Sequence, residues 1–161
     1  MKLFLHWMNK MGEDVDEQGR RLQTLDELLR VAIEMRRHID EVGDQFGLSG
    51  PQVRLLLALD HPLRMNAAAE ATACEPPHVT ILAEQMERSG LLVRTRDPAD
   101  RRARLLVLTD AGVRRREEVI PALLENAPVV SVLDLEACIG LTQHLRTGRG
   151  VSAAAGPGSD G

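Results

Sequence analysis

The chain has 161 residues, of which 43% are hydrophobic and 27% are charged, a composition typical of one globular domain with a substantial core. Its formal net charge of −4 argues against a protein that coats nucleic acid, because that mode of binding needs many cations against phosphates. Aromatic residues make up only 2% of the chain, which argues against binding of single strands by base stacking.

The N-terminal segment, residues 1–21, is predicted to be an extension followed by a linker. Its apolar start is too short to span a membrane and lacks a signal-peptide cleavage pattern, so no membrane partner is expected. The stretch from Gly12 to Gly19 is acidic and polar, which favours a linker. Cys74 and Cys138 lie far apart without metal-ligand spacing, which fits a reducing, cytoplasmic location.

Residues 22–47 are predicted to form a long helix, because apolar residues recur at helical spacing over about six turns. These positions are Leu22, Leu25, Leu29, Ala32, Ile33, Ile39, Val42 and Phe46. The helix is either a plain core helix or a dimerisation helix that joins a second helical segment near the C-terminus. Its length in so small a protein favours dimerisation.

A second helix is predicted to begin after Ser49, which is placed to cap it. Gln52 completes a capping box with Ser49, and Leu48 with Val53 forms a hydrophobic staple. The helix should end before Pro62. Its nearly continuous apolar run predicts burial on almost all sides.

The following stretch predicts a helix-turn-helix. A short, Ala-rich helix over residues 66–73 is followed by a turn and by a longer helix from Pro76 to Ser89, which Gly90 stops. One face of the longer helix is apolar and is expected to be core. The face available to a DNA groove carries His78, Ile81, Gln85 and Arg88, with Thr80 and Glu84 beside them.

Two apolar runs, starting at Leu91 and Leu105, predict strands joined by an arginine-rich loop. Between Arg94 and Arg104 there are five arginines and two aspartates. Helix, turn, helix, strand, basic loop and strand over residues 65–109 are the order of a winged helix-turn-helix. An isolated arginine cluster is usually a solvated hairpin, but its place directly after a helix-turn-helix favours DNA contact.

The C-terminal part is predicted to be helical. Thr109 should cap a helix from Asp110, and Pro121 should kink or end it. Another helix is expected from about Asp134 to Arg146, so residues 110–146 would supply the C-terminal dimerisation helices. The tail, residues 147–161, is rich in Gly, Ala, Ser and Pro and is predicted to be disordered. The predicted fold is mainly α with a small β-wing, with residues 48–109 as the DNA-binding domain.

The wing segment resembles a known signature. The run Asp97, Pro98, Ala99, Asp100, Arg101, Arg102, followed by Leu108, Thr109, Asp110, Ala111 and Gly112, is similar to the wing of the multiple antibiotic resistance regulator (MarR) family. The preceding helix and its exit also resemble that family, and the similarity covers roughly residues 22–146. It implies a homodimer interlocked through its first and last helices. It also implies a repressor of a pseudo-palindromic operator, released by a small aromatic or lipophilic ligand.

The resemblance also implies roles for individual residues. By position, His78, Thr80 and Ile81 would face the bases, Arg102 would enter the minor groove, and Asp100 would brace that arginine. A narrow A·T minor groove concentrates negative potential, which attracts a guanidinium at a hairpin tip. The candidate DNA-binding residues are Pro77, His78, Thr80, Ile81, Gln85, Arg88, Arg101 and Arg102.

Two positions depart from the family pattern. Pro77 stands where the family often has a small hydroxyl residue, which removes one hydrogen bond. Ile81 stands where a polar or basic residue is frequent, so it can touch a thymine methyl but cannot bond a base edge. Sequence specificity therefore cannot be transferred from relatives.

Other kinds of site find little support in the sequence. The five histidines are scattered without metal-ligand spacing, and there is no nucleotide-binding glycine pattern, catalytic triad or paired-carboxylate site. No enzyme, cofactor or metal is therefore expected. For His38, a surface or interface position is favoured over a ligand cleft, and for Cys74 a small buried hydrophobe over a reactive thiol. The alternative function is a helical protein-interaction module that has lost DNA binding, which would not need Asp100 and Arg102.

Overall fold

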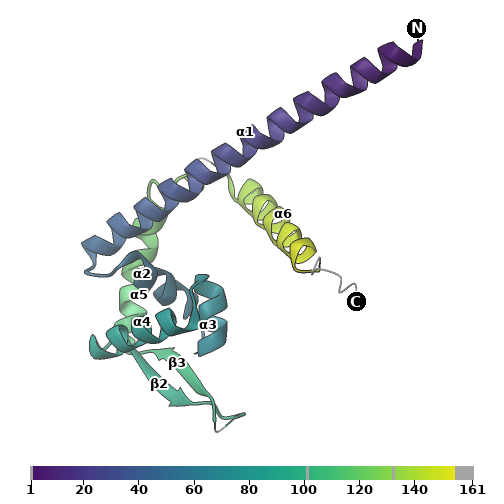
Figure 1. The fold of residues 1–161 in the computed structure, drawn as a ribbon. Coiled ribbons are helices and arrows are strands. Elements are labelled where there is room, and N and C mark those ends of the chain that lie inside the picture. The colour runs from purple at the N-terminus through teal and green to yellow at the C-terminus, as the bar shows by residue number, and fades with distance from the viewer. Residues whose placement is uncertain (1, 101, 132, 155–161) are drawn as a thin grey trace, which may run out of the picture.

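The computed structural model describes residues 2–100, 102–131 and 133–154, and side-chain environments from residue 16 to residue 147 within these ranges. Figure 1 shows a lobe of shorter helices and a small sheet, with one long helix projecting far beyond it. The elements in chain order are α1 (Lys2–Gln45), α2 (Gly50–Ala58), β1 (Leu63–Arg64), α3 (Met65–Thr72), α4 (Pro76–Arg88), β2 (Leu92–Arg96), β3 (Arg104–Leu108), α5 (Asp110–Leu124) and α6 (Leu135–Ala154).

Helix α1 is continuous from Lys2 to Gln45, so the linker expected over residues 12–19 is wrong. Glycines at 12 and 19 each cost about 1 kcal/mol in a helix, but ion pairs one turn apart act in the opposite direction. Asp16 pairs with Arg20 at 2.9 Å and Glu17 pairs with Arg21 at 2.6 Å. An acidic residue four positions before a basic one was the signal for helix in this segment.

Helix α2 forms with the predicted capping box. The backbone N–H of Ser49 donates to Gln52 Oε1 at 2.9 Å, and the N–H of Gln52 donates to Ser49 Oγ at 3.4 Å. Val53, Leu55 and Leu56 are fully buried. As predicted, α2 is the central helix of the core, and it contacts α1, α3, α4 and α5.

The sheet has three strands in the order β1-β3-β2, all antiparallel to their neighbours. The hairpin of β2 and β3 was predicted, and its register pairs Val93 with Val107. Strand β1 was not predicted, because two residues after Pro62 are too few to show an alternating pattern. It pairs Leu63 with the fully buried Leu106, which fixes the wing to the helical lobe.

The C-terminal helices differ from expectation at their ends. Thr109 caps α5 as predicted, by accepting the N–H of Gly112 at 3.1 Å. Pro121 lies inside α5, which ends one turn later at Leu124. Helix α6 continues to Ala154, so disorder is wrong for residues 147–154, where alanines help an existing helix to propagate. The rest of the predicted tail, residues 155–161, lies outside the described residues.

A contiguous apolar core joins the C-terminal part of α1, through Val42, with α2, α3, α4, the sheet and α5. The rest of α1 and helix α6 instead carry large apolar side chains that are exposed. Exposed on these two helices are Leu22, Leu25, Leu28, Leu29, Ile33, Leu135, Ile139, Leu141 and Leu145. Among the described residues no helix is both long and apolar enough to cross a membrane.

Candidate nucleic-acid interface

The turn between α3 and α4 is built by backbone geometry and one arginine. Ala73 has a left-handed φ of 49° and ends α3. Its N–H donates to Glu70 O at 3.1 Å, and the N–H of Cys74 donates to Ala69 O at 3.0 Å. The carbonyl of Thr72 accepts a hydrogen bond from the guanidinium of Arg54 on α2. These contacts set the angle at which α4 leaves the lobe.

Helix α4 has the two faces that the sequence predicts. Val79, Leu82, Ala83 and Met86 are buried, and Pro76 and Pro77 occupy its first turn, where a missing N–H costs nothing. On the other face the exposed residues include Pro77, His78, Ile81, Glu84 and Arg88. The helix therefore presents a polar and aliphatic ridge to solvent.

Three of the candidate residues on α4 already have hydrogen-bond partners within the fold. The Nε of Arg88 donates to Glu84 O at 3.3 Å. The hydroxyl of Thr80 donates to Pro76 O at 3.1 Å. Gln85 Oε1 accepts from Gln52 Nε2 on α2 at 3.2 Å, which ties α4 to α2. The side chains of Thr80 and Gln85 are half-buried, so Ile81 and Arg88 are more accessible on this face.

The wing hairpin of β2 and β3 projects from the lobe beneath α4 (Figure 1). Arg96, Arg102 and Arg104 are exposed along it. The candidate Arg101 lies outside the described residues. Asp100 Oδ1 accepts the backbone N–H of Arg102 at 3.0 Å, so the brace recorded here acts on the backbone of Arg102.

Asp97 holds the wing tip in place, a role that the sequence analysis missed. Its side chain is only 9% exposed, and its Oδ1 accepts the N–H of Ala99 at 2.8 Å. Its Oδ2 accepts from Arg64 Nε at 2.7 Å. The Ala99 N–H and then the Arg64 guanidinium hold the pKa of Asp97 below its usual value. An aspartate before a proline, able to accept from a backbone N–H two residues later, was the available signal.

Arg94 fastens the wing to the recognition helix. Its Nη2 donates to Thr80 O at 3.3 Å, and its guanidinium lies 3.5 Å from a carboxylate oxygen of Glu87 and 3.9 Å from one of Glu84. Only 27% of its side chain is exposed. In the sequence Arg94 belongs to the basic loop, whereas in the fold its guanidinium lies beside two carboxylates of α4.

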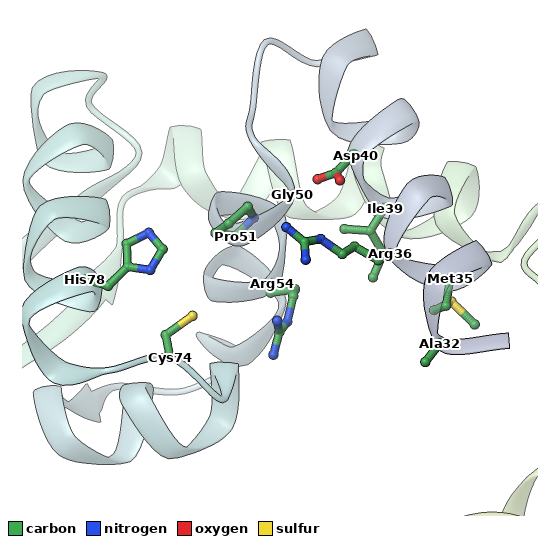
Figure 2. A pocket seen from close by; sticks show the side chains of 10 residues that line it. All are labelled: Ala32, Met35, Arg36, Ile39, Asp40, Gly50, Pro51, Arg54, Cys74 and His78. Carbon is green, nitrogen blue, oxygen red and sulfur yellow. The ribbon is translucent and has the colours of Figure 1, made fainter. Parts of the chain in front are cut away.

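A cavity of about 700 Å³ opens between α1, the start of α2 and the start of α4. Figure 2 shows the side chains around it, including the imidazole of His78 on the α4 side. The lining residues are Ala32, Met35, Arg36, Ile39, Asp40, Gly50, Pro51, Arg54, Cys74 and His78. Its walls thus combine an apolar part with two arginines and one aspartate, and they reach the first turn of the recognition helix.

The sequence left two interpretations each for His38 and Cys74, and the structure places the two residues differently. His38 is partly buried and its Nε2 lies 2.9 Å from Leu123 O, so it joins α1 to α5 and is not among the residues that line the cavity. Cys74 is half-buried, lines the cavity and donates weakly to Thr72 O at 3.5 Å. Within the described part of the chain no cluster of three or more His, Cys, Asp or Glu side chains is placed to bind a metal.

The helix-turn-helix and most of the wing match a known family. Residues 46–103 match the model of the MarR family. The chain is 34% identical over 76 residues to the HTH-type transcriptional repressor MdtR of Bacillus subtilis (strain 168). That alignment covers 46% of this chain and 49% of MdtR, so the chain spans about half the length of this curated relative.

Solved structures share most of this fold. AbsC, a MarR family transcriptional regulator from Streptomyces coelicolor, superposes with a TM-score of 0.69 at 20% identity, over 83% of this chain and 94% of AbsC. NadR in complex with 4-hydroxyphenylacetate superposes with a TM-score of 0.67 at 23% identity, over 75% of this chain and 88% of NadR. These similarities confirm the predicted winged helical fold.

Proposed function

We propose that this chain, whose residues 46–103 match the model of the MarR family, is a transcriptional repressor that binds a pseudo-palindromic operator as a homodimer. One observation carries the proposal: the exposed face of α4 and the cationic wing are locked together as one unit by Arg94. A helix and a hairpin held at a fixed angle can engage a major groove and the adjacent minor groove together.

The two parts of this unit have different roles in the proposed complex. His78 and Ile81 on α4 are placed to meet base edges, with Ile81 suited to a thymine methyl. Arg102 on the wing supplies the charge for a narrow minor groove. Arg88, exposed in the last turn of α4, is suited to a phosphate. Positive charge is concentrated at the wing, although the chain as a whole is acidic.

The homodimer is supported by the apolar side chains that α1 and α6 leave in the open. Leu22 is 66% exposed, Ile33 69% and Leu135 77%. Large apolar groups exposed along two helices mark an interaction surface, and a second copy of the chain offers the same surface. A two-fold axis through these helices would place the two α4 helices about one turn of DNA apart.

The cavity beside α4 suits a small aromatic or lipophilic acid as the releasing ligand. Its volume of about 700 Å³ is in the range of small-molecule sites. Met35 and Ile39 offer an apolar wall, and Arg36 and Arg54 offer cations. NadR, with which this fold superposes, binds 4-hydroxyphenylacetate. A ligand here would lie against α1 and the recognition helix of the same chain.

Selection of DNA from a random library by the purified protein, followed by footprinting, tests the proposal. We expect a protected site with two-fold symmetry and half-sites about one helical turn apart, bound with nanomolar affinity in moderate salt. As a regulator of genomic DNA, the protein would act in the cytoplasm. Absence of any enriched sequence would favour the alternative, an interaction module that has lost DNA binding, to which the comparisons add no support.

A further inference from the structure

We propose that Arg54 links the cavity to the helix-turn-helix, and that an organic carboxylate in the cavity acts by drawing the Arg54 guanidinium away from the turn. This inference rests on the proposed function, because it takes the cavity to hold a small acid. It adds the residue that transmits binding, and it makes the charge of the ligand the property that matters.

The Arg54 side chain contacts the turn and also lines the cavity. It lies on α2, and its Nη2 donates to the carbonyl of Thr72, the last residue of α3. The same side chain lines the cavity, and Figure 2 shows it among the other side chains there. One flexible guanidinium therefore faces both the turn and the space that a ligand would fill.

The turn depends on this contact because of how α3 ends. The last carbonyls of a helix lack partners within the helix. Those of Ala69 and Glu70 are satisfied by the N–H groups of Cys74 and Ala73, whereas that of Thr72 is satisfied by Arg54 and weakly by the Cys74 thiol. Ala73 is a non-glycine residue with a left-handed φ of 49°, a conformation that persists only when its surroundings hold it. Recognition helix α4 begins three residues later.

A carboxylate competes with the Thr72 carbonyl by charge. A hydrogen bond between a guanidinium and a carboxylate is considerably stronger than one to a neutral carbonyl, and it can be bidentate. Arg36 lines the same cavity and adds positive charge, with Asp40 as the acidic residue in the lining. A neutral ligand of the same shape has no comparable attraction for Arg54. Its occupancy should therefore leave the turn intact.

The preferred ligand is accordingly a monocarboxylate with an apolar body. Its acid group would meet Arg54 and Arg36, and its body would pack on Met35 and Ile39. Binding would release the turn, broaden the range of α4 orientations and weaken operator binding. By linkage, operator DNA would weaken ligand binding by the same factor.

Amide hydrogen exchange of the full chain, followed by NMR, tests the coupling without DNA. The reporters are the N–H groups of Ala73 and Cys74, which are hydrogen-bonded in the turn. The N–H of the buried Leu56 serves as the control, because its exchange reports global opening. The probes are 4-hydroxyphenylacetate and its neutral amide, 4-hydroxyphenylacetamide. The variants are R54Q, R54K, which keeps a cationic donor, and R36Q, which removes a cavity cation that has no recorded bond to the turn among the described residues.

We expect the carboxylate to speed exchange at Ala73 and Cys74 about tenfold and the amide to have no effect. Without any probe, the turn of R54Q should exchange as fast as that of wild type with the carboxylate, and neither probe should change its rate. Without a probe, R54K and R36Q should exchange like wild type. Exchange at Leu56 should stay constant throughout. The proposal is overturned if R54Q exchanges like wild type at the turn, if the carboxylate leaves turn exchange unchanged, or if the amide is equally effective.

The same variants separate this proposal from the proposed function. If wild type does not bind an operator but the exchange results are as expected, the proposed repressor function is refuted and the role of Arg54 stands. If the carboxylate weakens operator binding equally in wild type and R54Q, the role of Arg54 is refuted and the repressor function stands.

Discussion

Arg64 on strand β1 and Asp97 at the base of the wing tip form an ion pair in which Arg64 Nη2 lies 2.6 Å from Asp97 Oδ2. The two residues are 33 positions apart in the sequence. Since β1 leads directly into α3, this pair connects the wing tip to the helix-turn-helix. The orientation of the hairpin is therefore set partly by a contact outside the hairpin itself.

The Asp97 contact predicts that the wing loses order in acid. Its pKa is lowered by the Ala99 N–H and the Arg64 guanidinium. Its contribution to stability is therefore complete above the ordinary aspartate pKa of about 4 and is lost as the pH falls through the lower value in the fold. Backbone amide relaxation should show the wing becoming mobile below about pH 4. D97N should have a mobile wing at neutral pH, whereas D100N should not.

Gly112 is predicted to be essential at the start of α5. A Cβ at this position would lie 1.9 Å from the carbonyl oxygen of Leu91. The same oxygen accepts the N–H of Thr109. G112A should therefore lower the free energy of unfolding by about 2 kcal/mol or more, measured by urea denaturation. G140A is the matched control, since its added methyl meets open space on α6 and should stabilise the helix by about 0.5 kcal/mol. Equal effects of both would contradict the packing described here.

His38 is predicted to matter for stability and not for operator binding. Its Nε2 bonds Leu123 O at 2.9 Å, joining α1 to the last turn of α5. H38A should reduce the free energy of unfolding by about 1 kcal/mol and leave the operator dissociation constant unchanged. A marked loss of DNA affinity, in a variant that is still folded at the assay temperature, would show that His38 has a functional role.

The exposed apolar side chains of α1 and α6 predict a dimer that introduced charges should dissociate. Leu29 on α1 is 55% exposed and Leu135 on α6 is 77% exposed. If these side chains are buried against a second copy, the double variant L29E/L135E should sediment as a monomer with the circular dichroism of a folded chain. R30A, at an exposed polar position on α1, should stay dimeric. A wild-type monomer at micromolar concentration would refute the dimer.

Much of the helix-turn-helix could be predicted from local patterns. The capping box of Ser49 and Gln52, the two prolines at the start of α4 and the Thr109 cap each act within one helical turn, so the sequence shows them directly. Contacts between distant segments could not be seen this way. Arg94 looked like free positive charge because its partners Glu84 and Glu87 lie on another element. For the same reason, the pairing of Asp97 with Arg64 left no local trace.

Helix boundaries at the two ends of the chain were the least predictable. Polar composition and two glycines indicated a linker before residue 22, but ion pairs such as Asp16 with Arg20 support a helix that composition alone hides. The cavity was equally invisible, because Arg36, Arg54 and His78 come from three helices that only the fold brings together. His78, which the sequence places on the DNA face, also lines the cavity in the fold.

The most direct test of the central claim is the operator dissociation constant of R102A compared with that of R20A. Both changes remove one arginine, but Arg20 lies far along α1, paired with Asp16 and 72% exposed. We expect R102A to bind at least about tenfold more weakly with a salt dependence reduced by about one counterion, and R20A to bind like wild type. Equal affinity of R102A and wild type, or an equal loss in both variants, would contradict a wing that reads DNA.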